Sequence, residues 1–341
     1  MILIKKKWIK YDGVVFKSMK IESFAPGKII LFGEHTVVYN KPAIAVAINR
    51  GVDVELTSRD DDEVNIHISP INYSQKLVLT DGMLNYEYDS SNKRISDYIY
   101  EVINRFKFNH GFNLNVNINM YLGAGLGSSA AVTVAVLKAV MLYTDNDATL
   151  DEIASIARDI EIKIQGAASP IDTAMSTYGG IIYIDENSNL NPINFDMQLP
   201  LIVSNCEIAG NTGEIVASVK DKYDKHTPIM ESIFDAMAKI ATDAKIALEC
   251  GNSMKLAELM NMNQGLLDAI GVNTLELSEM VYQSRKFGSE GSKLTGSGGG
   301  GCIIAYAPHD SDEVYLKLSQ LYKTFKCKQS NSGVYAKIVE K

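Results

Sequence analysis

The chain has 341 residues, 46% of them hydrophobic, and its 33 Lys and Arg against 41 Asp and Glu give a formal net charge of -8. A chain of this length can bury a large core, which favours two domains over one. An acidic chain repels nucleic-acid phosphates, so no nucleic-acid partner is expected, and local groups must bind any anionic substrate.

Cysteine spacing and apolar runs predict a cytoplasmic protein that is not a membrane protein. The four cysteines form no C-x-x-C pair and no zinc-like cluster with histidine, so we expect reduced thiols. The longest apolar run, 130–143, is too short to span a bilayer and contains Lys138. Lysines interrupt the first ten residues, so the apolar core of a signal peptide is not expected there. We interpret residues 1–18 as a loose N-terminal extension or as the product of a wrongly chosen start codon.

The front half of the chain begins with predicted strands. Lys28–Phe32 is predicted as a strand that ends at Gly33, and Ala43–Ile48 and Val52–Thr57 are predicted as two more. In Phe112–Met120 apolar residues alternate with asparagine, which is typical of a strand with one buried face.

Two predicted helices follow. Ser128–Tyr143 is apolar on nearly every side, which is typical of a helix buried all round. Leu150–Ile164 carries one apolar stripe at 3- and 4-residue steps, and Gly166 is expected to end this helix. A short strand is predicted at Ile181–Ile184, and the polar stretch Asp185–Asn194 after it contains the expected domain boundary.

The back half is richer in helix. Ile229–Cys250 and Met254–Ile270 are predicted helices, and Ser292–Tyr306 is predicted as strand, glycine loop and strand. The fold class is therefore α+β, with a first domain over residues 19–190 and a second over residues 191–341.

The run from Gly123 to Ala130, GAGLGSSA, is the strongest chemical signal. Its glycines let backbone N–H groups approach phosphate oxygens, and the loop opens onto a helix N-terminus, which favours anions. The Ser128 and Ser129 hydroxyls can reach a phosphate or its magnesium ion. The run lacks the G-K-[ST] of a Walker loop and the third glycine of a Rossmann loop. A tight strand-to-helix turn capped by serine is the structural alternative. The residues assigned to ATP binding are Gly123, Ala124, Gly125, Leu126, Gly127, Ser128 and Ser129.

Two carboxylates and a lysine are candidates for catalysis. Glu161 falls within roughly 60° of the centre of its helix's apolar stripe, where a buried carboxylate needs a partner such as Mg²⁺. The alternative is an ordinary half-exposed acid. Asp172 could accept a hydroxyl proton, although it also stands three residues after Ser169 in a capping-box pattern. Lys28 could stabilise a developing alkoxide or hold Asp172, or it could be a solvated strand lysine.

A third glycine-rich run, from Lys293 to Cys302, has five glycines among the six residues 296–301. Such a run is costly in backbone entropy, and apolar strand-like segments flank it on both sides. A flexible linker is therefore less expected than a close approach to another segment or to a ligand.

Together these motifs resemble the superfamily of galactokinase, homoserine kinase, mevalonate kinase and phosphomevalonate kinase, the GHMP kinases. Ala25–His35, Gly123–Ala131 and Lys293–Cys302 are similar to its three motifs and occur in the same order. Within the superfamily, the segment from Gly33 to Tyr39 is similar to the mevalonate-contacting segment of the mevalonate kinases. The segment from Gln165 to Asp172 looks like the archaeal form of their catalytic site.

The resemblance implies a fold, a reaction and a site. The first domain would have a left-handed β-α-β crossover and the second would be ferredoxin-like, with the site in the cleft between them. The implied reaction is ATP-dependent phosphorylation of the primary (C5) hydroxyl of mevalonate, in isoprenoid biosynthesis, by an enzyme that is often a homodimer. The implied roles are catalysis by Asp172 and Lys28, Mg²⁺ binding by Ser129 and Glu161, and substrate binding by Glu34, His35, Thr212, Gly296 and Gly298.

Two alternatives stay open at this point. Another GHMP kinase, such as a mevalonate 3-kinase or a phosphomevalonate kinase, would act on a different acceptor, and a 3-kinase would be expected to lack the Lys28 and Asp172 pair. A non-catalytic ligand sensor with the same fold could lose Asp172, Glu161 or Ser129 without consequence.

Overall fold

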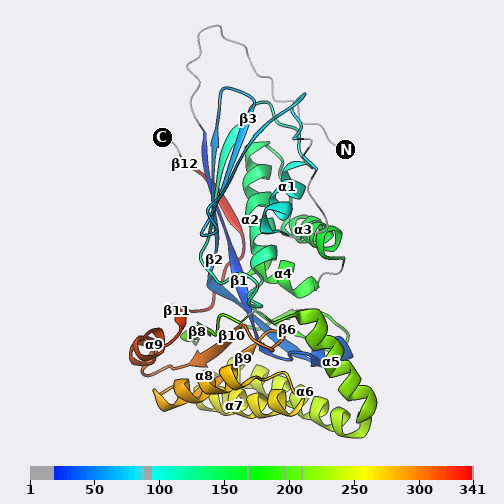
Figure 1. Ribbon diagram of the computed structural model, residues 1–341, viewed down its shortest axis with the longest axis vertical. Helices are drawn as coiled ribbons and strands as arrows, with labels where there is room; N and C mark the ends of the chain where they lie inside the picture. The colour runs from blue at the N-terminus through cyan, green and yellow to red at the C-terminus, as the bar shows by residue number, and fades with distance from the viewer. Residues whose placement is uncertain are drawn as a thin grey trace.

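The computed structural model describes residues 19–84, 86–87, 94–166, 169–195, 197–208 and 210–339. The predicted extension over residues 1–18 lies outside this part of the chain. The described residues form two layered halves stacked along the long axis of the molecule (Figure 1). None of the helices in the described ranges has the length and apolar character that crossing a membrane requires. All four cysteines are free thiols.

A mixed sheet organises the upper half. Its strands are β1 (Lys20–Phe32), β2 (Ala43–Ser58), β3 (Glu63–Ser69), β4 (Tyr73–Val78), β5 (Phe112–Ile118), β6 (Ile181–Ile184), β7 (Leu190–Pro192) and β12 (Tyr335–Val339). The main path runs β12-β1-β2-β5-β3-β4, and β6 pairs with β2 and β7. Strands β3 and β5 are parallel, and helix α1 (Ile95–Ile103) lies between them in the chain. The left hand of this crossover stays a prediction.

Helices α1, α2 (Ser128–Tyr143), α3 (Leu150–Gln165) and α4 (Pro170–Tyr178) cover one face of this sheet (Figure 1). The predicted bounds of α2 are confirmed, and α3 extends the predicted helix by one residue before the left-handed Gly166 ends it. Most of α2 is buried because it lies between the sheet and its neighbouring helices. Strand β5 alternates as predicted, with its apolar side chains buried.

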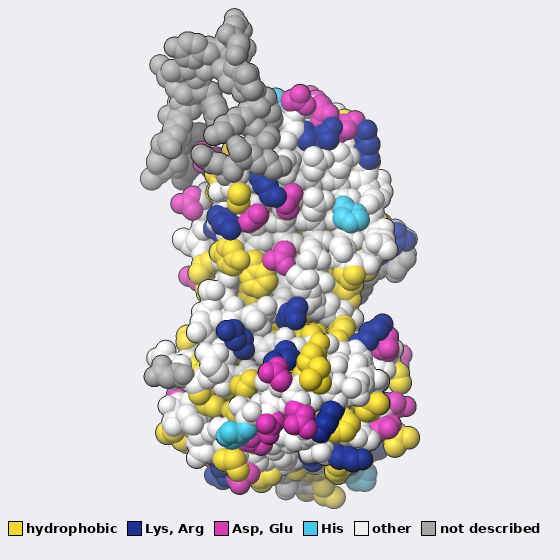
Figure 2. Space-filling view, turned by 90° about the vertical axis from the view of Figure 1, so that its left-hand side faces the viewer, with side chains coloured by type: hydrophobic (Ala, Val, Ile, Leu, Met, Phe, Trp, Pro, Cys, Tyr) yellow, Lys and Arg dark blue, Asp and Glu magenta, His cyan; other side chains and the backbone are white. Residues whose placement is uncertain are grey.

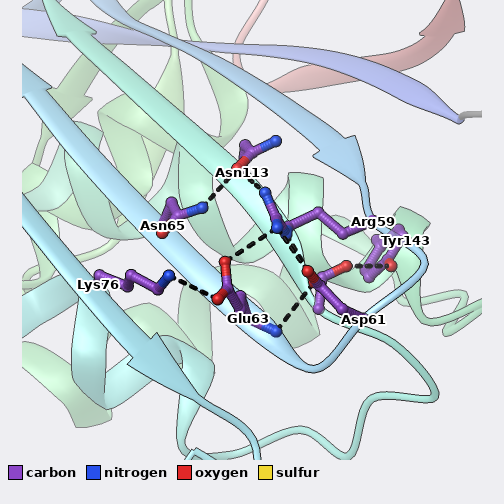
Figure 3. Close-up of polar contacts among 8 residues, drawn as sticks. Arg59, Asp61, Glu63, Asn65, Lys76, Asn113 and Tyr143 are labelled. Atoms are coloured by element: carbon purple, nitrogen blue, oxygen red, sulfur yellow. Dashed lines mark hydrogen bonds and ion pairs between the residues drawn. The ribbon is translucent and has the colours of Figure 1, made fainter.

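Away from the second half, the opposite face of the sheet is polar, as Figure 3 shows for one end of it. Arg59 donates to Asp61 at 2.5 Å and to Glu63 at 2.9 Å, and Lys76 pairs with Glu63 at 2.5 Å. Arg59 also donates to Asn113 at 3.3 Å, which joins the end of β2 to β5. Such partly exposed pairs contribute little stability each, so this network keeps the face solvated rather than building a core.

One prediction about the sheet is wrong. Residues 43–58 form a single strand, β2, where two strands were predicted. Its ladder with β1 continues past a register shift between Pro26 and Gly27. A bulge lets a strand bend without ending. From the sequence alone, a glycine that lies in a bulge cannot be distinguished from a glycine that lies in a turn, so one bent strand was predicted as two.

The lower half has a four-stranded antiparallel sheet. Its elements are β8 (Leu201–Asn205), α5 (Thr212–Lys225), α6 (Thr227–Glu249), α7 (Ser253–Ala269), α8 (Leu275–Lys286), β9 (Gly291–Thr295), β10 (Cys302–Tyr306), α9 (Ser311–Ser319) and β11 (Lys323–Cys327). The order β11-β8-β10-β9 places the four strands of this half in the sequence 4-1-3-2 of a ferredoxin-like sheet. This confirms the predicted architecture, and the helices fill the two crossovers.

The two halves share one hydrophobic core although the molecule narrows between them (Figure 2). The largest apolar cluster contains residues of β1, β2 and α2 together with residues of β8, β10, α6 and α7. A hinge motion between the halves would therefore have to open packed apolar surface. The division at residue 190 stays a prediction, and β12, which follows the second half in the chain, pairs with β1 in the first sheet.

Candidate active site

The predicted phosphate loop lies between β5 and α2 with its glycines in left-handed conformations. The φ angles are 66° at Gly123, 76° at Gly125 and 71° at Gly127. Gly127 is the N-cap of α2 and has no side chain with which to cap it. The N–H groups of the first turn of α2 are therefore available to an anion, as phosphate binding requires.

The loop is fixed to strand β1. The Lys28 N–H donates to the carbonyl oxygen of Leu126 at 2.9 Å, and the side chain of Leu126 is buried. A Cβ atom on Gly127 would lie 2.9 Å from the Lys28 Cγ atom. The absence of a side chain at Gly127 thus gives the Lys28 side chain its path past the loop.

Lys28 and Asp172 meet beside this loop. The distance from Lys28 Nζ to Asp172 Oδ1 is 3.3 Å, and the two side chains are 7% and 29% exposed. The Ser176 hydroxyl donates to the Pro26 carbonyl oxygen at 2.9 Å, which holds α4 against β1. Ser169 caps α4 by accepting from the Ile171 N–H at 3.2 Å. Asp172 therefore faces the lysine, while Ser169 performs the capping that the sequence pattern indicated.

Glu161 is buried next to these residues. Its carboxylate accepts a hydrogen bond from the Ser129 hydroxyl at 2.8 Å. Burial and the negative charge of Asp172 raise the pKa of Glu161 to about 7, although the Ser129 bond and the Lys28 charge act in the opposite direction. The carboxylate is therefore short of positive charge, which a cation would supply.

These residues fit a magnesium ion. A carboxylate and a hydroxyl are hard oxygen donors, and Mg²⁺ is commonly held by one or two carboxylates together with substrate phosphates. Within the described ranges, no group of three or more His, Cys, Asp and Glu side chains forms a metal cage. Glu161 and Ser129 thus suit an ion that arrives with a nucleotide better than an ion held by protein alone.

The third glycine run lies against the phosphate loop. A Cβ atom on Gly125 would lie 3.2 Å from the Cα atom of Gly296, so the two backbones meet without side chains between them. The Thr295 hydroxyl donates to the Ile30 carbonyl oxygen at 2.9 Å and ties β9 to β1. The two glycine runs, far apart in sequence, therefore form one continuous surface.

Two of the predicted substrate residues meet at Ser297. The His35 Nε2–H donates to the Ser297 carbonyl oxygen at 2.8 Å, and burial lowers the pKa of His35. The hydroxyls of Thr212 and Ser297 are 3.1 Å apart. Glu34 differs from both, because its side chain is 1% exposed and forms an ion pair with Lys293, which is fully buried.

Comparison with known proteins decides the family. Residues 97–180 match the model of the GHMP kinase N-terminal domain, and residues 244–324 match that of the GHMP kinase C-terminal domain. The chain is 39% identical to a mevalonate kinase of Methanothermobacter thermautotrophicus, over 93% of this chain and all of that relative. The chain belongs to the mevalonate kinase family of the GHMP kinases.

Other mevalonate kinases agree with this assignment. A relative from Pyrococcus abyssi is 38% identical over 85% of this chain and 89% of its own. The crystal structure of the Methanococcus jannaschii mevalonate kinase superposes with a TM-score of 0.80 at 29% identity, covering 93% of this chain and 99% of that one. The predicted likeness to archaeal mevalonate kinases and the two-domain GHMP kinase fold are thereby confirmed.

Sequence reasoning missed several residues that hold this candidate site together. Ser297 links His35 to Thr212, and Lys293 pairs with Glu34. The Gln264 side-chain oxygen accepts a hydrogen bond from the Leu294 N–H at 2.8 Å, which gives a partner to a backbone donor on the edge strand β9. Lys293 and Ser297 stood inside the third glycine-rich run, and Gln264 stood inside a predicted helix. No periodicity or spacing distinguished them, because their partners are distant in the chain.

Proposed function

We propose that the protein transfers the γ-phosphoryl group of ATP to the primary hydroxyl of mevalonate and releases 5-phosphomevalonate and ADP. The observation that carries this proposal is the ion pair of Lys28 and Asp172 at 3.3 Å, beside the open N-terminus of α2. A carboxylate that can accept a proton and a cation that can stabilise an alkoxide therefore lie next to a phosphate-binding loop.

The nucleotide would be held by the loop and the start of α2. N–H groups of residues 123–129 would bind the β- and γ-phosphates. Glu161 and Ser129 would hold the magnesium ion, which when bound neutralises charge on the phosphate oxygens. The 2.8 Å hydrogen bond between these two side chains places both donors on the same side of the loop.

Asp172 and Lys28 would carry the transfer step. The hydroxyl oxygen of mevalonate forms a bond to the γ-phosphorus, and the bond from that phosphorus to the oxygen bridging to the β-phosphate breaks. The hydroxyl proton passes to Asp172. Lys28 stabilises the charge that develops on the attacking oxygen and keeps Asp172 oriented.

Mevalonate would lie between the first motif and the third. His35, Thr212, Gly296 and Gly298 are proposed contacts, because His35 and Thr212 converge on Ser297 at the same loop. The buried ion pair of Glu34 does not favour a direct contact from that side chain. The predicted homodimer and the predicted cytoplasmic location stay predictions.

The test compares acceptors and locates the new phosphate. ATP consumption is measured with mevalonate, phosphomevalonate, homoserine and galactose, and the product is examined by phosphorus NMR. We expect turnover with mevalonate and phosphate on its primary oxygen. Phosphate on the tertiary oxygen would favour a 3-kinase, and ATP binding without turnover on any acceptor would favour a ligand sensor.

A further inference from the structure

A fully buried ion pair between Lys293 and Glu34 joins the two halves next to the candidate site. Lys293 on β9 is 0% exposed and the Glu34 side chain is 1% exposed. The second oxygen of Glu34 accepts from Asn263 Nδ2 on α7 at 3.4 Å, and Lys293 Nζ also donates to the Leu294 carbonyl oxygen at 2.7 Å. Three segments that are distant in the chain thus share one buried polar contact.

This contact is not expected to be present for stability alone. Burying two charges costs hydration energy that their attraction rarely exceeds, and an apolar pair of similar volume is often as stable. Burial also lowers the pKa of Lys293, which shows how poorly solvated its charge is. A buried pair of this kind can instead specify one arrangement of the segments that it joins.

The neighbours of both partners lie in the candidate site. His35 follows Glu34 and donates to Ser297 at 2.8 Å. Thr295, two residues after Lys293, bonds to β1 at 2.9 Å and precedes Gly296, whose backbone lies against Gly125. A shift of Lys293 relative to Glu34 would therefore move the third glycine run relative to both His35 and the phosphate loop.

We propose that Glu34 and Lys293 are positioning residues, which set the third glycine run against His35 and the phosphate loop without touching mevalonate. This inference rests on the proposed function, and it gives Glu34 a different role from the substrate contact that the resemblance implied. Asn263 supports the pair by holding the second oxygen of Glu34.

The first experiment is a double-mutant cycle with Glu34→Gln, Lys293→Met and the combined variant. Each single variant leaves a buried charge without its partner, so we expect Tm to fall by roughly 10 °C in each, and most of this loss to be regained in the double variant. Activity is measured where circular dichroism shows every variant folded. We expect KM for mevalonate to rise roughly tenfold in all three variants, without addition in the double variant. KM for ATP should stay within about threefold, because the phosphate loop keeps its own bond to β1.

A matched control removes another interdomain pair. Lys41 and Asp235 are 2.6 Å apart and also link the two halves, but their side chains are 31% and 66% exposed. Lys41→Met should change neither Tm by more than about 2 °C nor KM for mevalonate.

Two outcomes of the double-mutant cycle would overturn the proposal. A double variant that regains both stability and mevalonate affinity would make the pair purely structural. A Glu34→Gln defect without a matching Lys293→Met defect would make Glu34 a direct substrate contact.

A second measurement needs neither turnover nor the variants that remove a charge. Hydrogen–deuterium exchange of a peptide covering residues 292–302 should quicken at least roughly fivefold in Asn263→Ala, which keeps both charges and should fold. Unchanged exchange would contradict the positioning role. Failure of the proposed function would look different, because the unsubstituted protein would then not consume ATP with mevalonate.

Discussion

Two lysine–carboxylate pairs lie beside the glycine runs, and they differ in how much water reaches them. Lys28 and Asp172 stand 3.3 Å apart with 29% of the Asp172 side chain exposed, whereas Lys293 and Glu34 are sealed. A carboxylate that is partly exposed can meet a substrate and exchange a proton. The carboxylate of Glu34 is fully buried against a fully buried lysine, which suits it to holding its neighbours in place. The same two chemical groups can therefore serve reaction in one place and alignment in the other.

Of the residues in the two pairs, Asp172 is the one whose substitution should lower kcat most. Asp172→Asn preserves shape and removes the proton acceptor, so we expect kcat to fall roughly a thousandfold, about 4 kcal/mol in the barrier. ATP affinity, measured by calorimetry, should change less than about threefold because the phosphate loop is untouched. Asp159→Asn on the exposed side of α3 is the control. Near-normal turnover in Asp172→Asn would reduce Asp172 to a helix-terminal acid.

The second largest expected effect is a change of stability with pH, and it originates at Glu161. Its pKa rises from the ordinary value of 4.5 to about 7 on folding, so the folded state binds more protons than the unfolded state between these values. The ligand-free protein should therefore lose up to about 3 kcal/mol of stability as pH rises from 5 to 8. Denaturant unfolding at both pH values measures this loss.

The variant Glu161→Gln isolates that contribution. It cannot ionise, so the difference in stability between pH 5 and pH 8 should shrink by the same amount, while Asp159→Asn should behave like the unsubstituted protein. An equal pH dependence in Glu161→Gln would contradict the assignment of the raised pKa to this carboxylate.

Substitution of Lys28 is expected to lower kcat less than substitution of Asp172. Lys28→Met should lower kcat roughly a hundredfold, about 2.7 kcal/mol, because the attacking oxygen loses its cation but keeps its proton acceptor. Combining Lys28→Met with Asp172→Asn should cost less than the sum of the two defects, since the two groups act on the same oxygen. Independent, additive losses would show that they do not act together.

The smallest expected effect comes from the glycine beside Lys28. Gly127→Ala would place its Cβ 2.9 Å from Lys28 Cγ at a φ of 71°, and we expect kcat to fall roughly tenfold. Gly123→Ala is the matched control, since its φ is 66° and its Cβ would meet nothing within 4 Å. Equal losses in both variants would assign the effect to backbone strain rather than to the displaced lysine.

Local patterns predicted much of the fold. The bounds of α2 were correct because its apolar run ends at a glycine loop on one side and a polar turn on the other. The strand–loop–strand unit of β9 and β10 was predicted because glycine-rich runs interrupt strand periodicity clearly. Lys28, Asp172, Ser129 and Glu161 were singled out from the sequence, and the structure brings them together.

Long-range pairings could not be predicted from the sequence. Lys293 and Glu34 are 259 residues apart, and although each stands inside a motif, nothing in the local pattern shows that the two side chains pair. The sequence did not predict that β2 is one continuous strand, for a related reason. Only the pairing of β2 with β1 shows that the ladder bends instead of ending. Spacing along a chain reports neighbours on one element, and it contains no information about which elements meet.

The place of β12 has a consequence for how the protein is made. This strand pairs with β1 from Lys20 opposite Val339 to Phe24 opposite Tyr335, so one edge of the first sheet is completed only after the whole second half has been synthesised. At ordinary rates of synthesis the delay between β2 and β12 is roughly 15 to 60 s. During that time β1 presents open backbone groups to other chains, which is a hazard for aggregation. A nascent chain stalled before residue 335 should therefore be bound by chaperones more strongly than a chain stalled after residue 339 has emerged.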